Sequence, residues 1–392
     1  MIDLNRIDLG RRELTGMDSA DREWMRSYEN RLMMALYISY LEARKGGKRK
    51  THDEHIFEVN AMENLRLLHR DIMQKTYRPS RSTAHIIYNP VIREIFAAPF
   101  RDRVVHHLLF EAVSDWWDRR FIYDSYSCRK GKGTLFGIQR LDHHIRVVSQ
   151  NYARPAWILK LDVQGYFMSL PRRELYARAV WGLERQFAER LDSREYEMLK
   201  FLWWQTIFDD PVKGVHKKGD LAAWGDLPPS KSLFCQPPGK GIVIGNLTSQ
   251  LLSNVYLDQL DRFVTMDLGY KHYGRYVDDF YIVVNENELP QLKKDVMAIE
   301  NYLQCKQLTL HPHKRSLQEM HRGVDFLGAV VYPGRIVPGA RLVRNCGKAL
   351  REVAEGRRSV DTVASYMGHV KYMKGISLLR RSFDWAGWEY QA

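Results

Sequence analysis

The fold is decided by the stretch Arg275-Tyr276-Val277-Asp278-Asp279-Phe280-Tyr281-Ile282-Val283-Val284. Strong β-formers flank the two aspartates, which predicts a β-hairpin with its turn on the aspartates. Two like charges between buried strands repel each other, so they raise the pKa of one carboxyl group or destabilise the turn. A divalent metal ion removes that repulsion. An ordinary Asp-Asp turn stays an alternative for this stretch alone, because turns favour aspartate for its local hydrogen bonds.

A third carboxylate strengthens the metal interpretation. Asp162 ends the apolar segment 156–161, which we expect to be a strand. Carboxylates on two strands that meet in space can hold two Mg²⁺ ions about 3.5–4 Å apart, an arrangement suited to in-line nucleotidyl transfer. One ion activates a primer 3′-hydroxyl, and the other holds the triphosphate and the leaving pyrophosphate. The sequence therefore predicts a metal site at Asp162, Asp278 and Asp279.

Three motifs in chain order carry a resemblance to reverse transcriptases. Tyr276-Val277-Asp278-Asp279 resembles their (Y/F)xDD box, and Asp162 resembles their first catalytic aspartate. Between them lies Ile244-Gly245-Asn246-Leu247-Thr248-Ser249-Gln250, where that family has a GxxxSP-type motif. The resemblance covers roughly residues 30–375 and implies an RNA-directed DNA polymerase, a nucleotidyltransferase that copies a template RNA into cDNA from dNTPs. It also implies two Mg²⁺ ions, with Mn²⁺ as an alternative, at Asp162, Val163, Asp278 and Asp279.

Composition indicates a folded, basic protein. The chain has 392 residues, of which 45% are hydrophobic, and it has a net charge of +13 and a pI of about 9.4. Such a chain predicts a polyanionic partner, although general basicity for solubility is the plainer explanation. The four cysteines form no CxxC pair, which argues against a zinc ribbon or a disulfide framework. We find neither a signal-peptide segment nor an apolar run of membrane-spanning length, and we expect a cytoplasmic protein.

The expected architecture is an α+β right-hand polymerase fold. We predict an N-terminal helical arm over residues 1–75, fingers over 76–155, a palm with an antiparallel sheet over 156–334 and a helical basic thumb over 335–392. A loop insertion at about 209–240 interrupts the palm, because prolines, glycines and lysines crowd that stretch. The thumb segment holds eleven Lys or Arg and five Asp or Glu, a net charge of +6, which suits the backbone of an RNA–DNA duplex.

Three arginines in the predicted fingers are candidate contacts to nucleotide or template. Residues 86–96 predict a hairpin around Asn89-Pro90, and the block from Arg93 to Arg103 resembles a fingers motif of bacterial reverse transcriptases. The resemblance implies that Arg93 and Arg101 serve the incoming nucleotide and that Arg103 serves the nucleic acid. A guanidinium forks onto phosphate oxygens, so the residue type fits. A structural salt bridge is the alternative for at least one residue of Arg101-Asp102-Arg103.

Two further segments are candidate contacts by the same resemblance. Arg129-Lys130-Gly131-Lys132-Gly133 resembles the template-contacting block, in which Arg129, Lys130 and Lys132 would track the RNA backbone. Its spacing does not match GxxxxGK(S/T), which argues against a nucleotide hydrolase. Phe167 resembles the steric gate that rejects a 2′-hydroxyl and thereby favours dNTPs. Core packing is the alternative for Tyr166 and Phe167, and we expect one of the two to be buried.

The third box departs from the commoner pattern at two positions. Ile244 precedes the glycine in place of Gln, and Gln250 follows the serine in place of Pro. An (I/V/L)GxxxSQ box resembles the reverse transcriptases of diversity-generating retroelements, which copy a template RNA with errors at adenines. An apolar side chain cannot hydrogen-bond the nucleotide, which suits weaker geometric checking. We therefore place Ile244, Gly245 and Gln250 at the nucleotide, and we expect Thr248 or Ser249 to cap the following helix.

Three motifs near the C-terminus complete the candidate site. Lys314 ends a block, Leu308 to Lys314, that resembles the L-x-L-x-x-x-K motif, in which a lysine near the triphosphate protonates pyrophosphate. Residues 324–329 resemble the primer grip, a tight hairpin near the primer end, and residues 365–371 resemble the S-x-x-G-H block of bacterial thumbs. Basic residues also recur every three or four positions along 341–351, which places them on one helical face. The nucleic-acid candidates here are Phe326, Leu327, Gly328, Arg344, Lys348, His369 and Lys371.

The resemblance favours an enzyme of mutagenic retrohoming in a diversity-generating retroelement. Its partners would be template RNA, primer or cDNA, dNTPs and the small basic oligomeric accessory protein with which such enzymes work, although the sequence does not show that protein. One alternative is a retron-type or defence-associated reverse transcriptase, which gene neighbourhood distinguishes. An alternative of another class is a non-catalytic RNA-binding protein on a polymerase fold, against which the intact set of aspartates argues.

Overall fold

A four-stranded antiparallel sheet organises one of the two units into which the chain divides. The computed structural model describes residues 27–45, 51–88, 91–187 and 193–374. The first unit comprises residues 1–121 and 165–259, and the second comprises residues 122–164 and 260–392. In the described ranges, no helix combines the length and the apolar character that crossing a membrane requires.

The sheet of the second unit has the strand order β5-β6-β3-β7. Its strands are β3 (Ala156–Asp162), β5 (Tyr273–Tyr276), β6 (Asp279–Asn285) and β7 (Ser316–Glu319). Aromatic and β-branched residues fill β6, and five of its seven positions are buried, which suits a central strand. The predicted hairpin around the two aspartates is confirmed. Its turn is at Val277-Asp278, however, and Asp279 is already the first residue of β6, paired with Tyr276.

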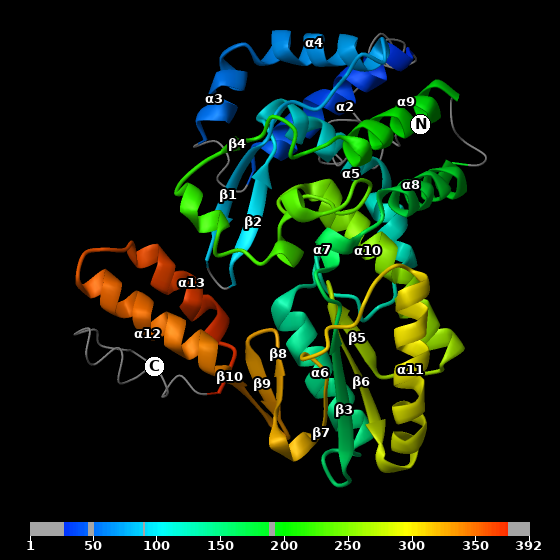
Figure 1. Cartoon of the computed structure of the whole chain (residues 1–392), viewed down its shortest axis with the longest axis vertical. Coiled ribbons are helices and arrows are strands. Elements are labelled where there is room, and N and C mark those ends of the chain that lie inside the picture. The colour runs from blue at the N-terminus through cyan, green and yellow to red at the C-terminus, as the bar shows by residue number, and fades with distance from the viewer. Residues whose placement is uncertain (1–26, 46–50, 89–90, 188–192, 375–392) are drawn as a thin grey trace, which may run out of the picture. The chain divides into compact units, whose positions relative to one another are not determined.

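Helices α6 (Thr134–Val148) and α11 (Leu289–Cys305) lie beside this sheet (Figure 1). The apolar residues of α6 recur at helical spacing and present one face to the sheet. Ile138, Leu141 and Ile145 of that face are fully buried in one cluster with Ile158 of β3 and Val283 of β6. The core that supports the aspartate-bearing strands therefore lies between α6 and the sheet. Short helical turns η6 (Glu286–Glu288) and η7 (Met320–Arg322) complete this region.

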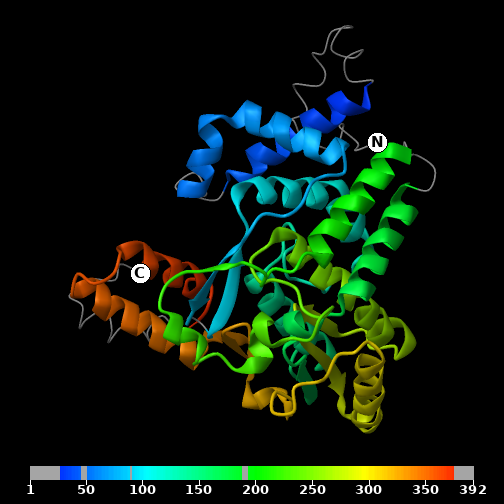
Figure 2. The same cartoon turned by 45° about the horizontal axis from the view of Figure 1, so that its top comes forward.

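A small sheet and two helices form the C-terminal part of the second unit. The sheet has the order β10-β9-β8, with strands β8 (Val324–Phe326), β9 (Ala329–Tyr332) and β10 (Arg335–Pro338). Helix α13 (Val360–Val370) folds back along α12 (Ala340–Ala354), and the two share a buried apolar contact (Figures 1 and 2). The predicted helices are confirmed from residue 340, whereas residues 335–338 form a strand because they pair with β9. Residues 375–392 of the expected thumb lie outside the described residues.

Helices dominate the first unit. They are α2 (Tyr28–Ala43), α3 (His52–Val59), α4 (Ala61–Met73), α5 (Phe100–Arg120), α7 (Tyr166–Ser169), α8 (Arg172–Phe187) and α9 (Ser193–Phe208). Helix α2 packs against both α4 and α5, as both views show (Figures 1 and 2). Asn60 separates α3 from α4. Residues 1–26 of the expected arm lie outside the described residues.

A second hairpin lies in the first unit. Strands β1 (Thr83–Ile87) and β2 (Arg93–Ala97) pair antiparallel, which confirms the hairpin predicted around residues 89 and 90. Strand β4 (His216–Lys217) adds to β1 in parallel. The rest of the segment 209–240 contains only the short turns η2 (Leu221–Trp224), η3 (Pro229–Lys231) and η4 (Leu233–Cys235), as the expected loop insertion predicts. The helices and antiparallel sheets together confirm the α+β class.

Candidate active site

The register of the central sheet brings the three predicted aspartates together. Strand β3 pairs with β6 so that Asp162 lies directly opposite Asp279. Directly opposed residues of an antiparallel pair project from the same face of the sheet. Asp278 precedes Asp279 in the turn, and its carbonyl accepts a hydrogen bond from the Val163 N–H at 3.1 Å. Two carboxylates from neighbouring strands and a third from the adjoining turn thus gather at one end of the sheet.

This gathering is electrostatically unfavourable for the carboxylates themselves. Burial, reinforced by the charges of Asp162 and Asp279, raises the pKa of Asp278 from 3.8 to about 7. Burial also raises the pKa of Asp279 to about 6; the neighbouring Lys160 opposes the rise and Asp162 adds to it. Like charges directly opposite each other destabilise an antiparallel pair. The site therefore holds more negative charge than the surrounding groups neutralise.

Two lysines partly offset that charge. Lys314 lies with Nζ 3.0 and 2.9 Å from the two carboxylate oxygens of Asp162, so the structure brings this predicted residue to the site. Lys160 lies with Nζ 3.5 Å from Oδ2 of Asp279 and was not predicted. The sequence contained a signal for it, because Lys160 precedes Asp162 by two positions and strand alternation places both on one face. Within the described part of the chain, Asp278 forms no ion pair.

The donor set fits a divalent cation. Burial and the neighbouring carboxylates raise the pKa of Asp278 and Asp279, a bound cation would offset that repulsion, and carboxylate oxygens are the ligands that Mg²⁺ prefers. Among the described residues, no group of three or more His, Cys, Asp or Glu side chains forms a metal cage by itself. Mg²⁺ commonly takes one or two carboxylates and completes its shell with water and substrate phosphates, so a complete protein cage is not required.

The predicted primer grip is a tight hairpin whose side chains mostly face inward. Leu327 and Gly328 form the two-residue turn between β8 and β9, both with positive φ, as a type I′ turn requires. Phe326 is fully buried, and its ring contacts that of Tyr281 edge-on at 5.1 Å between centroids. Phe326 was expected to contact nucleic acid, but its buried ring instead packs the hairpin onto β6.

The cations of the loop after α5 have unequal environments. Arg129 donates from Nη1 to the carbonyls of Ile122 and Ser125, at 2.7 and 2.9 Å, and so holds its own loop together. Lys132 donates from Nζ to the Tyr123 carbonyl, and the same Nζ lies 4.0 Å from the centroid of the Tyr123 ring. Lys130 is exposed. Of the three predicted RNA contacts, Lys130 is thus the most accessible in this structure.

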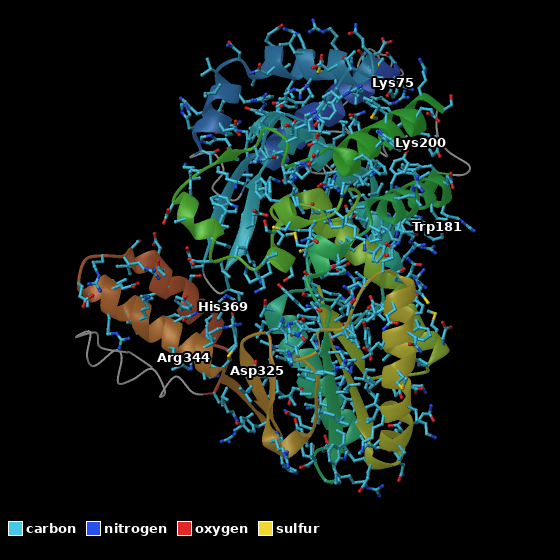
Figure 3. The ribbon with its side chains drawn as sticks, viewed as in Figure 1. Lys75, Trp181, Lys200, Asp325, Arg344 and His369 are labelled. Atoms are coloured by element: carbon cyan, nitrogen blue, oxygen red, sulfur yellow. The ribbon has the colours of Figure 1, made fainter. Side chains whose placement is uncertain are left out.

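The predicted thumb cations lie on the surface of α12, α13 and the turn that follows. Arg344 on α12 and His369 on α13 are exposed (Figure 3). Lys371 is exposed as well, and Lys348 is exposed with its Nζ 3.8 Å from a carboxylate oxygen of Glu352. A weak exposed pair of this kind leaves the lysine free to exchange partners. These four positions remain predicted contacts to nucleic acid.

In the first unit, the three predicted arginines differ in their contacts. Arg93 begins β2 and is exposed. Arg101 donates to Asp71 at 2.9 Å and to Asp102 at 3.2 Å, which confirms the salt-bridge alternative for this residue. Arg103 donates from Nε to the Ala98 carbonyl at 2.8 Å. Arg93 is accordingly the most accessible candidate of the three for an anionic ligand.

The predicted gate residues lie in the short helix α7. Tyr166 is buried and its hydroxyl donates to the Ser253 carbonyl at 2.5 Å, whereas Phe167 is only half-buried. One aromatic is thus in the core, as expected, and Phe167 remains the gate candidate. The two residues are helical rather than part of a strand, because Gly165 turns the chain with φ +54°.

The third box lies against β2. The Ile244 carbonyl accepts from the Phe96 N–H at 3.0 Å, and a Cβ added to Gly245 would lie 2.7 Å from the Phe96 carbonyl oxygen, so only glycine fits there. Helix α10 (Leu247–Arg262) begins one residue before Thr248. The predicted cap at Thr248 or Ser249 is therefore wrong: both lie inside the first turn and are buried. Gln250 lies half-buried in the same helix.

Comparison with known proteins identifies the family. No match was found among curated proteins. Among solved structures, a telomerase from Candida albicans, in complex with a TWJ fragment of telomeric RNA, is similar with a TM-score of 0.48 and 13% sequence identity. The match covers 80% of this chain and 57% of the telomerase chain. The family model for reverse transcriptase (RNA-dependent DNA polymerase) matches residues 91–331, which include all three aspartates. The chain therefore belongs to the reverse transcriptase family.

Proposed function

We propose that the protein is an RNA-directed DNA polymerase whose nucleotidyl-transfer centre consists of Asp162, Asp278 and Asp279. The observation that carries the proposal is the register of β3 against β6, which sets Asp162 opposite Asp279 beside the turn that holds Asp278. Membership of the reverse transcriptase family supports the same reaction. The substrates would be a template RNA, a primer 3′-hydroxyl and dNTPs.

Each residue of the site has a distinct task in this proposal. The carboxylates of Asp162, Asp278 and Asp279, with the carbonyl of Val163, would hold two divalent cations, Mg²⁺ foremost. Such cations supply positive charge to the attacking and leaving oxygens of an in-line displacement. Lys314 donates from Nζ to Asp162, and we assign to it the protonation of the leaving pyrophosphate. Lys160 holds positive charge beside Asp279 and limits the repulsion there.

The test is a matched pair of conservative substitutions. Asp278→Asn keeps the shape of the side chain and removes its charge, so we expect primer extension on RNA to fall on the order of a thousandfold. Asp267→Asn makes the same change at an exposed position of the same unit and should leave extension unchanged. Affinity for template RNA, measured by fluorescence anisotropy, should be similar in all three proteins. Unchanged extension by Asp278→Asn would overturn the assignment of the site.

Within the family, we propose the diversity-generating retroelement class, with template copying that is error-prone at adenines. The support is the third box. Apolar Ile244 stands where Gln is commoner, and Gln250 stands where Pro is commoner. Ile244 is partly buried and packs against an apolar cluster of Ala84, Phe96, Met168 and Leu233. A small basic oligomeric accessory protein is part of this finer proposal.

Sequencing of the cDNA tests that assignment. We expect misincorporation concentrated opposite template adenines in the wild type, and a lower adenine-specific error rate in Ile244→Gln. Val243→Gln changes the neighbouring apolar residue of the same cluster and serves as the matched control. Accurate wild-type cDNA would favour the retron-type or defence-associated alternative. An error spectrum that Ile244→Gln does not alter would overturn the role given to the third box.

A further inference from the structure

The turn that carries Asp278 has an unfavourable backbone conformation. Val277 has φ +57°, in the left-handed region that a β-branched residue rarely adopts. Such a conformation persists only where the surrounding structure imposes it. Because Val277 directly precedes Asp278 and Asp279, whatever imposes it also sets the direction of both carboxylates.

Arg275 contacts the backbone of this residue directly. Its Nη1 donates to the Val277 carbonyl at 2.9 Å, from a side chain that is fully buried. Its Nε and Nη2 donate to the two carboxylate oxygens of Asp261, each at 2.7 Å. A bidentate pair of this kind fixes the plane of the guanidinium and hence the position of Nη1. The Tyr273 hydroxyl also donates to Asp261, at 2.6 Å, so the buried carboxylate is well satisfied.

The pair is itself anchored in two other segments. Asp261 lies in the last turn of α10, directly before the π-helical turn η5 (Phe263–Asp267), whose Phe263 ring stacks on Tyr302 at 4.2 Å. Arg275 Nη2 also donates to Ser125 Oγ at 3.3 Å. The Arg275 backbone donates to the Asp124 carbonyl and accepts from the Tyr126 N–H, both at 2.9 Å. The Arg275 guanidinium thus connects the Val277-Asp278 turn to the end of α10 and to Ser125, which lies just before the Arg129–Gly133 block.

We propose that Arg275 and Asp261 are positioning residues for nucleotidyl transfer, which hold the Val277-Asp278 turn so that the aspartates meet Asp162 in a cation-binding arrangement. This inference rests on the proposed function, since it gives that site a support that the family motif does not contain. A merely structural ion pair would affect folding alone. A positioning pair affects cation affinity and turnover in protein that is still folded.

The decisive variant removes both charges together. Removing one partner would leave a buried charge unpaired and endanger the fold, whereas replacing a buried pair with apolar residues of similar volume is often tolerated. We therefore choose Arg275→Met with Asp261→Leu. The control replaces a partly buried ion pair of the first unit, Arg44 Nε to Glu54 Oε1 at 3.0 Å, by Arg44→Met with Glu54→Leu.

Two readouts separate positioning from folding. In protein with native circular dichroism, we expect the Arg275/Asp261 double variant to lose kcat about 100-fold while its KM for primer–template stays near the wild-type value. Its affinity for Mn²⁺, titrated by electron paramagnetic resonance without substrate, should fall as well. The control double variant should change neither quantity. A folded double variant with wild-type kcat and wild-type Mn²⁺ affinity would overturn the inference.

A third substitution tests the role of the strained residue. Glycine adopts positive φ without the steric penalty of valine, so Val277→Gly added to the double variant should recover part of the lost kcat. A triple variant no more active than the double variant would overturn the role given to the Val277 carbonyl. If wild-type protein binds Mn²⁺ but extends no primer, the proposed function fails, and the Mn²⁺ affinities alone still decide whether Arg275 and Asp261 position the site.

Discussion

Two groups of charged side chains lie close together in the chain, one buried and one half-buried, and they differ in how well neighbouring groups neutralise them. Arg275 and Asp261 form a bidentate pair with further donors and acceptors around it. A few residues further along the same hairpin, Asp278 and Asp279 have raised pKa values, and within the described residues lysines pair with Asp162 and Asp279 but not with Asp278. One group is therefore complete, because its opposite charges are paired. The other is incomplete, because its carboxylates outnumber the cations beside them.

The difference indicates that the Arg275–Asp261 pair supports the fold, whereas Asp278 and Asp279 are suited to bind a cation. A buried pair with good geometry and satisfied hydrogen bonds contributes rigidity, and breaking it is costly. Crowded carboxylates without sufficient counter-charge destabilise the metal-free protein and become favourable when cations bind. We expect substitutions in the two groups to have opposite effects on stability.

The largest effect on stability should come from the complete pair. Asp261→Ala leaves the Arg275 guanidinium buried without its carboxylate, and we expect a loss of about 3–5 kcal/mol in the free energy of unfolding. Asp267→Ala, at an exposed position six residues along, should change the free energy of unfolding by less than about 0.5 kcal/mol. Urea unfolding followed by tryptophan fluorescence measures both. A loss below about 1 kcal/mol for Asp261→Ala would mean that the pair is not a structural anchor.

A smaller effect, of opposite sign, should come from the incomplete group. The raised pKa values of Asp278 and Asp279 mean that the folded protein binds more protons than the unfolded chain between about pH 4 and pH 7. Stability from these groups is therefore present at low pH and is lost as the pH rises toward 7. Asp278→Asn removes one such group, so we expect it to stabilise metal-free protein at neutral pH by about 1–3 kcal/mol.

Thermal denaturation at several pH values measures this effect. The stability gained by Asp278→Asn should shrink as the pH is lowered from 7 to 4. Added Mg²⁺ should stabilise the wild type more than the variant, because a ligand stabilises the state that binds it. Equal stability of the two proteins at every pH, with equal responses to Mg²⁺, would contradict the description of Asp278 as an incompletely satisfied charge.

The smallest effect should come from the exposed cations of α12. Replacing Arg344 and Lys348 by Gln removes two candidate phosphate contacts, so RNA affinity should fall about tenfold at moderate salt. The slope of log affinity against log salt should decrease by about 1.5. Replacing Lys293 and Lys294 of α11 by Gln removes the same charge elsewhere on the unit and should matter less. Equal losses in the two double variants would indicate general electrostatics rather than a nucleic-acid surface at α12.

Part of the site was predictable because local patterns determine it. Strong β-formers around Asp278-Asp279 predict the hairpin, and the apolar run before Asp162 predicts its neighbouring strand. The family motif adds Lys314, whose proximity to Asp162 depends on the turn that leads into β7, and the sequence pattern alone does not specify that turn. Strand alternation would also have indicated Lys160, which lies on the face of Asp162.

Other features depend on tertiary packing and were not predictable. The partner of Arg275 lies at the end of α10, and nothing in the local sequence marks Asp261 as that partner. Phe326 was expected at the nucleic acid but packs beneath Tyr281, since an aromatic residue in a motif gives no indication of which face its strand buries. Arg101 and Arg129 were candidate phosphate contacts, yet both are engaged by neighbouring protein groups.

Primer extension on an RNA template, with Mg²⁺ omitted, added and then removed by EDTA, tests the central claim most directly. We expect a DNA product that forms from dNTPs only when Mg²⁺ is present, that stops growing on addition of EDTA, and that Asp278→Asn does not make. A folded wild-type protein that binds the primer–template and Mn²⁺ but forms no product under any of these conditions would contradict the assignment of the three aspartates as a polymerase centre.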